Sequence, residues 1–434
     1  MSLSIGFAQN DFVSTNIKHI PYIIKGYFFF QFIESNERLS RFLGKYLKSR
    51  NIKDYRFLLC HLASIYLRFS NYYETDLNKI ESTLTIDPKL IQVINFINTF
   101  ALEIPKDIEL INKDIFTNFS DVEKYDFDFK IFRNFPLFKE KYNVFHFLSL
   151  NFFGDTLFNN LKFDFKNFIE QESMKSDSLF DLLNYFSREF TEKYLFRRIM
   201  LPIFENNCDF LKAGKDKSDE YPEYGDYYIR IGNNILLFEC KDNIVSANIK
   251  TSYQSIKIKE ILIKKLASDK QGIIQLIKVI DNLSKDQINF DVYTKANKDK
   301  LKVYPILIYT DSILDTNGVN HFMNEQLLKL KIKYNYPFDL KNLIMINLDF
   351  LISHKSFFNK FITQFIEVLE IYSDLLQREI IPTKFDPSNF YPTFEEVFKD
   401  YLPNELDDIN NLQDKEFNDI MNNIMSSENC NFYN

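Results

Sequence analysis

The stretch that decides the predicted fold is GDYYIRIGNNILLFECKD, residues 225–242. Two apolar runs rich in β-branched and aromatic residues flank GNN, a pattern that predicts a β-hairpin. Asp226, Glu239 and Lys241 stand near the open end of this hairpin. A carboxylate among residues that a sheet buries costs free energy unless it has a partner. These three residues are therefore the first candidates for a functional site.

The turn of the hairpin determines whether the three side chains meet. Asn tolerates positive φ, so we expect Asn233 and Asn234 to form a two-residue turn. In that register Asp226 lies opposite Lys241. Side chains alternate along a strand, so Asp226, Glu239 and Lys241 would project from one face. A three-residue turn would shift the register by one and move Asp226 away from the other two residues.

This combination of charges indicates a specific chemistry. Two converging carboxylates repel each other unless a cation lies between them, and oxygen ligands without His or Cys favour Mg²⁺ or Mn²⁺. A lysine on the same face can orient or help to deprotonate a metal-bound water and stabilise charge on a phosphate. The set therefore suits hydrolysis of a phosphodiester. The structural alternative, an Asp226–Lys241 ion pair in an ordinary hairpin, does not explain why Glu239 follows the apolar run ILLF.

The tripeptide (Asp/Glu)-x-Lys does not identify a functional site by itself, because the chain contains it five times. No acidic partner strand is evident for the four other copies, and we expect them to be surface charge. They begin at Asp87, Asp128, Asp164 and Asp339.

The elements around the hairpin predict an α/β core. A helix over 178–204 should precede it, capped by Asp177 or Ser178 and ended by Pro202. A polar loop should join this helix to the hairpin. A lysine-rich helix, buried strands and a further helix should follow at about 253–283, 302–311, 342–352 and 357–376. The order of helix, two strands, helix and strand is typical of an α/β core around a mixed sheet.

The chain of 434 residues is too long for one ordinary domain, so we expect further regions on both sides of the α/β core. Apolar spacing predicts helices over 55–69 and 88–104, so residues 1–180 should form a mainly helical N-terminal region. We expect the α/β domain to cover 181–356. A C-terminal helix and an acidic, loosely ordered tail should cover 357–434.

Charge is unevenly distributed along the chain. The net charge is −7, yet residues 241–302 hold 13 Lys against 7 acidic residues. Residues 400–434 hold eight acidic residues and one Lys. The basic segment could bind a polyanion locally, and the alternative is a solvated helix face.

Several classes of protein lack support in the sequence. The first residues show no basic segment followed by an apolar one, as a signal peptide would, and no run of 18 apolar residues occurs. We therefore expect a soluble, cytoplasmic protein without a membrane partner. The four cysteines form no C-x-x-C pair and the five histidines no H-x-x-x-H pair, which argues against zinc. Phosphate-loop, dinucleotide-binding and G-x-S-x-G motifs are missing from the sequence as well.

Asp226, Glu239 and Lys241 resemble the motif of the PD-(D/E)xK nuclease superfamily, over about residues 185–355. In that superfamily an Asp opens one strand and (Asp/Glu)-x-Lys closes the next. The resemblance implies a restriction-endonuclease-like mixed sheet flanked by helices. It also implies that Asp226 and Glu239 bind Mg²⁺ or Mn²⁺ and that Lys241 activates water. Pro222 departs from the pattern, because it lies four residues before Asp226 instead of adjacent to it.

The resemblance also implies auxiliary residues. Members often place a glutamate on the preceding helix, where Glu189 and Glu192 are available. Glu192 is the better candidate, because it shares a helical face with Leu195, Phe196 and Ile199. A polar residue of the following helix can contact substrate or metal, which suggests Gln275. Phosphate contacts are expected from Lys264, Lys265 and Lys270.

We therefore expect a magnesium-dependent endonuclease that acts on nucleic acid, on DNA in preference to RNA. The resemblance extends this expectation to restriction or antiphage defence, and the N-terminal region could recognise substrate, gate the site or dock a protein partner. One alternative is an inactive nuclease-like module for nucleic-acid binding or assembly, which would bind without divalent metal. Another is a protein-binding helical scaffold whose hairpin is purely structural.

Overall fold

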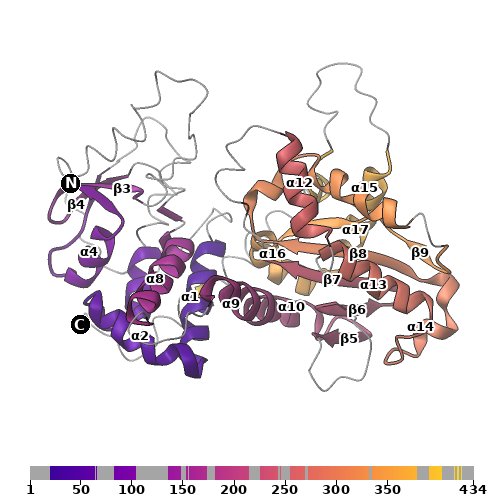
Figure 1. The fold of residues 1–434 in the computed structure, drawn as a ribbon, viewed down its shortest axis with the longest axis horizontal. Helices are drawn as coiled ribbons and strands as arrows, with labels where there is room; N and C mark the ends of the chain where they lie inside the picture. The colour runs from indigo at the N-terminus through magenta and orange to yellow at the C-terminus, as the bar shows by residue number, and fades with distance from the viewer. Residues whose placement is uncertain are drawn as a thin grey trace, which may run out of the picture. The chain divides into compact units, whose positions relative to one another are not determined.

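A computed structural model gives the fold of the chain (Figure 1). It forms two compact units, one made of residues 1–183 with 413–434 and one made of residues 184–412. The structure describes residues 20–63, 65, 83–103, 135–147, 153–154, 156–173, 181–214, 225–242, 245, 255–268, 272–331, 335–378, 391–402, 415, 418–419 and 422.

The second unit is a mixed α/β structure built on one sheet. Within the described residues this sheet has six strands in the order β10-β8-β7-β6-β5, and β9 pairs with β8. Strand β6 pairs antiparallel with β5 and with β7. Strand β8 pairs parallel with β7, β9 and β10. The strands are β5 Phe210–Ala213, β6 Tyr227–Ile231, β7 Asn234–Lys241, β8 Lys302–Tyr309, β9 Asp339–Leu340 and β10 Ile344–Asn347.

Helices cover both faces of this sheet because its central strands are apolar on both sides. Alternate residues of β7 point in opposite directions, so Ile235 and Leu237 face one layer and Phe238 the other. Helices α12, α13 and α15 cover the first face. Helices α10, α16, α17 and α18 lie on the second. Their bounds are α10 Phe196–Phe204, α12 Ser255–Leu266, α13 Gly272–Ser284, α15 Val319–Lys331, α16 Leu348–Lys360, α17 Ile362–Leu376 and α18 Phe394–Tyr401.

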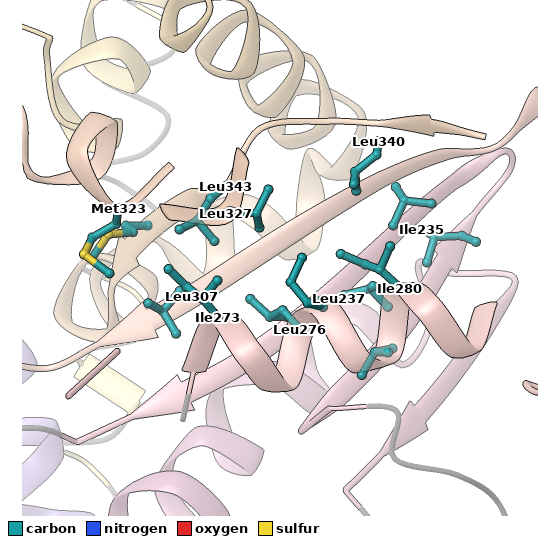
Figure 2. Packing of buried hydrophobic residues seen from close by; sticks show 14 of the residues in the cluster. Ile235, Leu237, Ile273, Leu276, Ile280, Leu307, Met323, Leu327, Leu340 and Leu343 are labelled. Carbon is teal, nitrogen blue, oxygen red and sulfur yellow. The ribbon is translucent and has the colours of Figure 1, made fainter. Parts of the chain in front are cut away.

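The first layer holds a continuous apolar cluster (Figure 2). Ile273, Leu276 and Ile280 recur on one side of α13, as the helical period requires, and pack toward Leu237 of β7 and Leu307 of β8. All five side chains are fully buried. Burial of this kind stabilises a fold by roughly 1.5–3 kcal/mol per large apolar side chain.

The second layer is mostly aromatic. The ring of Phe204 on α10 lies 5.7 Å from that of Phe238 on β7 and 6.3 Å from that of Phe365 on α17. Phe350 of α16 packs edge-on against Phe394 and Phe398 of α18. Helices α16 to α18 therefore belong to the sheet domain, and the boundary expected between 356 and 357 falls inside α16.

The hairpin β6–β7 forms, but its turn is Gly232-Asn233, and the expected Asn233-Asn234 turn is wrong. Ile231 pairs with Asn234, so Asn234 already belongs to β7. Gly232 has a positive φ of 59°, a value that glycine adopts readily at the first position of a tight hairpin turn. The register therefore differs by two residues from the expected one, and a shift of two keeps every side chain on its expected face.

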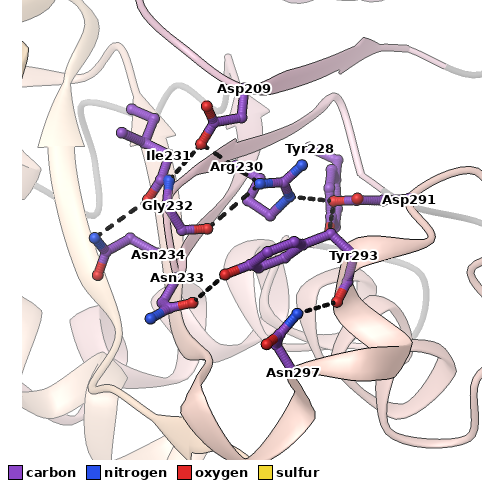
Figure 3. A network of polar contacts seen from close by, with 10 residues as sticks. All are labelled: Asp209, Tyr228, Arg230, Ile231, Gly232, Asn233, Asn234, Asp291, Tyr293 and Asn297. Atoms are coloured by element: carbon purple, nitrogen blue, oxygen red, sulfur yellow. Dashed lines mark hydrogen bonds and ion pairs between the residues drawn. The ribbon is translucent and has the colours of Figure 1, made fainter.

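A polar network holds the turn end of the hairpin (Figure 3). Asp291, buried to 2% exposure, accepts hydrogen bonds from Tyr228 Oη at 3.0 Å and Arg230 Nε at 2.8 Å. Asp209 accepts one from the backbone N–H of Gly232 at 2.6 Å. The Arg230 guanidinium also lies over the ring of Tyr293. Of these contacts, the one from Asp209 holds Gly232 at the bend.

Four further expectations about the second unit need correction. The loop expected before the hairpin contains β5, which forms by pairing with the free edge of β6. The helix ends at Phe204 rather than Pro202, because Ile203 and Phe204 bury their side chains in the last turn. The lysine-rich helix is two helices, α12 and α13. The strand expected over 342–352 ends at Asn347, whose side chain caps α16 by accepting from the backbone N–H of Asp349.

The described part of the first unit consists mostly of helix, and it also contains a four-stranded sheet that the sequence analysis did not predict. The sheet has the order β1-β4-β3-β2. The helix expected over 88–104 ends at Asn98, because Leu102 joins a strand that pairs with β3. Residues 55–63 are helical as predicted. The elements are α1 Ile20–Ser35, α2 Glu37–Ser49, β1 Thr83–Thr85, α4 Ile91–Asn98, β2 Ala101–Glu103, β3 Leu137–Lys141, β4 Val144–Phe147, the π-helix η3 Thr156–Asn160 and α8 Leu161–Ser173.

The core of the first unit joins α1 to α8 through aromatic rings. Phe29 of α1 lies edge-on to Phe165 of α8, at 6.2 Å between centroids. Asp164 of α8 accepts hydrogen bonds from Tyr46 Oη at 2.9 Å and Arg50 Nε at 3.1 Å. Asp164 therefore ties α2 to α8 and is not the solvated surface charge that the sequence suggested. No helix within the described residues of the whole chain is long and apolar enough to span a membrane.

We predict a pH-dependent loss of stability that originates at His354 of α16. Burial lowers the pKa of this histidine from 6.5 to about 4, and its Nδ1 lies 2.9 Å from the carbonyl oxygen of Phe350. Because the folded state disfavours the charged form, the contribution is fully present above pH 6.5 and is lost as pH falls toward 4. We expect this group to remove about 1–3 kcal/mol of unfolding free energy over that range. Urea unfolding should show a flatter pH dependence for His354→Phe, and an unchanged slope would contradict the assignment.

Candidate active site

The site begins where the strands β6 and β7 open. Asp226 immediately precedes β6, and Tyr227 pairs with Phe238, so the register places Asp226 opposite Glu239 instead of Lys241. The backbone N–H of Asp226 donates to the carbonyl of Phe238 at 3.0 Å. The N–H of Cys240 donates to Asp226 Oδ2 at 2.7 Å. The Asp226 carboxylate is thus held against the last residues of β7.

Glu239 is a carboxylate inside the sheet, with 1% exposure. The Lys241 Nζ lies 2.7 Å from its Oε1. This close ion pair ties the ammonium of Lys241 to the buried Oε1. Burial, reinforced by the nearby Asp226 charge, raises the pKa of Glu239 well above its usual range despite the opposing effect of Lys241. The repulsion between Glu239 and Asp226 is relieved either by protonation of Glu239 or by a cation bound between the two acids.

Lys241 remains protonated in this environment. Burial alone would lower the pKa of Lys241, but the carboxylates of Glu239 and Glu192 outweigh burial and raise the pKa above its ordinary value. A lysine in this state donates hydrogen bonds and supplies positive charge. Deprotonation of water, which the sequence left open as a role for Lys241, is disfavoured by that shift.

Glu192 reaches the site from an unusual helix. Helix α9 (Leu182–Tyr185) continues into the π-helix η4 (Phe186–Leu195), which runs directly into α10. Glu192 Oε1 accepts a hydrogen bond from the backbone N–H of Asp242 at 3.4 Å. Burial raises the pKa of Glu192 to about 7, with Lys241 opposing the shift and Asp226 adding to it. π-Helical turns occur frequently at functional sites.

The structure separates the two glutamates that the sequence offered. Glu189 forms ion pairs with Arg188 and Lys193, both at 2.9 Å, on the surface of η4. Those cations lower the pKa of Glu189 against the effect of its partial burial. Glu192 lies with the site residues instead, and the residues expected on its face, Leu195, Phe196 and Ile199, are buried.

Asp242 is a site residue that the sequence reasoning missed. Its carboxylate accepts hydrogen bonds from the hydroxyls of Thr191 at 2.8 Å and Thr310 at 2.5 Å. Its carbonyl accepts one from the hydroxyl of Ser187 at 2.9 Å. The only signal in the sequence was an acid directly after Lys241. Its partners lie about 50 and 70 residues away, and no local pattern links them.

The structure describes three of the other expected residues, on helices α12 and α13. Gln275 sits on α13 and is partly buried. Lys264 is exposed and Lys265 partly buried on α12. No ion pair joins the side chain of Lys264 to a described carboxylate of the site. Lys270 and Pro222 lie outside the described residues.

The acids of this site offer oxygen ligands of the kind that Mg²⁺ prefers. No group of three or more His, Cys, Asp or Glu side chains in the described part of the chain is arranged to hold a metal ion. Mg²⁺ is commonly held by only one or two carboxylates and keeps several of its waters. Asp226 and Glu239 would supply that number, with Lys241 paired to the Oε1 of Glu239.

Comparisons with models of protein families, with curated proteins and with solved structures found no match to this chain. Its function has to be inferred from the site itself.

We predict that Gly225→Ala will disrupt the site. Gly225 has a φ of 82°, and an added Cβ would lie 3.0 Å from the carbonyl oxygen of Phe238 and 3.8 Å from Glu239 Oε2. The substitution should cost about 1–3 kcal/mol and displace Asp226 from Glu239. Gly232→Ala is the matched control, because Gly232 also has positive φ but nothing lies within 4 Å of its added Cβ. Thermal unfolding and Mn²⁺ titration would test this, and equal Mn²⁺ affinity in both variants would contradict it.

Proposed function

We propose that this chain is a magnesium-dependent endonuclease of the PD-(D/E)xK type that hydrolyses phosphodiester bonds of DNA. One observation carries the proposal. The buried carboxylate of Glu239 lies 2.7 Å from the ammonium of Lys241, and Asp226 is held beside it from the adjacent strand. A sheet does not need two acids and a lysine at this point for stability, since apolar residues would be cheaper to bury.

Each residue has a distinct task in this proposal. Asp226 and Glu239 would hold Mg²⁺, which when bound supplies positive charge to the phosphate and lowers the pKa of a water molecule. Lys241, kept protonated by its neighbours, would orient the attacking water and stabilise negative charge on the phosphate. Glu192, with a pKa of about 7, could accept a proton near neutral pH.

The arrangement of elements supports the same proposal. The helical segment η4–α10 precedes an antiparallel hairpin, and two helices then lead to the parallel strand β8. The acid that opens β6 and the pair that closes β7 stand in the chain order of the PD-(D/E)xK motif. A restriction-endonuclease-like fold is part of this proposal.

The proposed substrate is DNA, and the proposed setting is restriction or antiphage defence in the cytoplasm. The setting rests on the resemblance of the motif alone. The basic segment 241–302 supplies lysines for contacts to a phosphate backbone, among them the exposed Lys264.

We predict that Glu239→Gln and Lys241→Ala will each reduce cleavage about 100- to 1,000-fold, because each removes a charge used at the reacting phosphate. Plasmid, linear duplex and single-stranded DNA, and RNA, should be incubated with Mg²⁺, with Mn²⁺ or with chelator. Cleavage should require the divalent ion.

The chain offers a matched control for this experiment. Lys341 belongs to another copy of the tripeptide, and its Nζ lies 3.0 Å from Asp339 and 2.6 Å from Glu370. This lysine is buried rather than the surface charge expected. Asp339→Asn and Lys341→Ala should lower stability but leave cleavage intact. If wild-type protein cleaves none of the substrates but binds nucleic acid without metal, the inactive binding module replaces the nuclease.

A further inference from the structure

We infer that Asp242 is a positioning residue of the active site, which holds Lys241 and Glu192 in place through hydrogen bonds to the π-helix η4 and to the end of β8. The bonds of Asp242 to Ser187, Thr191, Glu192 and Thr310 are called the clasp. This inference rests on the proposed nuclease function and deepens it. Asp242 follows β7 directly and bonds residues from two other elements.

The π-helix provides one side of the clasp. Ser187, Thr191 and Glu192 all contact Asp242, through its carbonyl, its carboxylate and its backbone N–H respectively. Hydrogen bonds in a π-helix span five residues, as from the N–H of Phe196 to the carbonyl of Thr191. The wider turn brings Ser187 and Glu192, which are five residues apart, toward the same side. Three successive contacts along η4 thus converge on one residue of the sheet.

Strand β8 provides the other side. Thr310 immediately follows β8, and its hydroxyl donates a hydrogen bond to Asp242 Oδ1. Cys240 and Lys241 are the residues of β7 that pair with Ile308 and Tyr309 of β8. The carboxylate therefore bonds one neighbour on each side, with Oδ2 directed to Thr191 and Oδ1 to Thr310. Loss of these side-chain bonds would leave the backbone pairing of β7 with β8 in place but would free the residue after Lys241 from η4 and from Thr310.

The bonding of Asp242 distinguishes it from the metal-binding acids. Both of its carboxylate oxygens accept hydrogen bonds from neutral hydroxyl groups, whereas Glu239 is paired with the ammonium of Lys241. Asp242 should thus act through Lys241 and Glu192 rather than bind the cation or the substrate. Groups that orient the residues of a metal site typically contribute 10- to 100-fold to affinity or activity.

The experiment compares Asp242→Asn with Asp291→Asn. Asp291 also bonds two donors in the same sheet but lies at the turn end of the hairpin, so its substitution controls for loss of stability. Cleavage should be measured well below the melting temperature of both variants. We expect Asp242→Asn to lower kcat about 10- to 100-fold with KM and Mn²⁺ affinity within twofold of wild type. Asp291→Asn should keep kcat within twofold.

The threonines provide a second measurement that does not depend on Asp242→Asn folding well. Thr191→Val removes the hydroxyl without changing the side-chain shape and should lower kcat, whereas Thr191→Ser should retain it. Combining Thr191→Val with Asp242→Asn should add little to the effect of Asp242→Asn alone, because both break one clasp.

Three results would overturn the inference. Unchanged kcat in Asp242→Asn, with wild type active, would refute the clasp and leave the nuclease intact. A parallel loss of Mn²⁺ affinity would make Asp242 a ligand or a purely structural residue. Absence of metal-dependent cleavage by wild type on every substrate would refute the nuclease, and the role of Asp242 with it.

Discussion

The pairing of β6 with β7 in a single register is the constraint on which the rest of the second unit depends. This register places Asp226 beside Glu239 and directs Ile235 and Leu237 toward α13. It is secured far from the site, where Asp291 binds Tyr228 and Arg230. The hairpin is therefore fixed at its closed end and carries charged groups at its open end. Because one face of β7 is apolar along most of its length, a slip by one residue would expose this face and bury polar groups.

The carboxylates at the open end oppose the stability that the closed end provides. Glu239 is buried beside a second acid, and such a group destabilises a fold unless a charge compensates it. Lys241 supplies part of that compensation, and its own charge is maintained by Glu239 and Glu192. The polar contacts that stabilise the hairpin thus lie at its turn, whereas the acids that repel each other lie at its opposite end.

The sequence predicted those parts of the structure that follow from periodicity. Alternation along β7 was sufficient to place Glu239 and Lys241 on one face, and it survived an incorrect turn because the error was two residues. The turn itself could not be predicted, since GNN permits both turns and the contact of Asp209 with Gly232 comes from a residue distant in sequence. The prediction of a helix over 178–204 assumed the α-helical period, from which η4 departs through hydrogen bonds that span five residues. The contacts of Asp242 depend on the assembled sheet and are invisible to any local pattern.

The two-residue turn also limits how this hairpin can change in evolution. A single inserted or deleted residue within β6 or β7 would exchange the two faces beyond that point, whereas paired changes in both strands would lengthen the ladder without reversing it. Gly232 is bound by Asp209, and Asn233 accepts a hydrogen bond from Tyr293, so even the tip cannot extend freely. Length variation among descendants of this chain should therefore be tolerated in the connections between elements and rejected within this ladder.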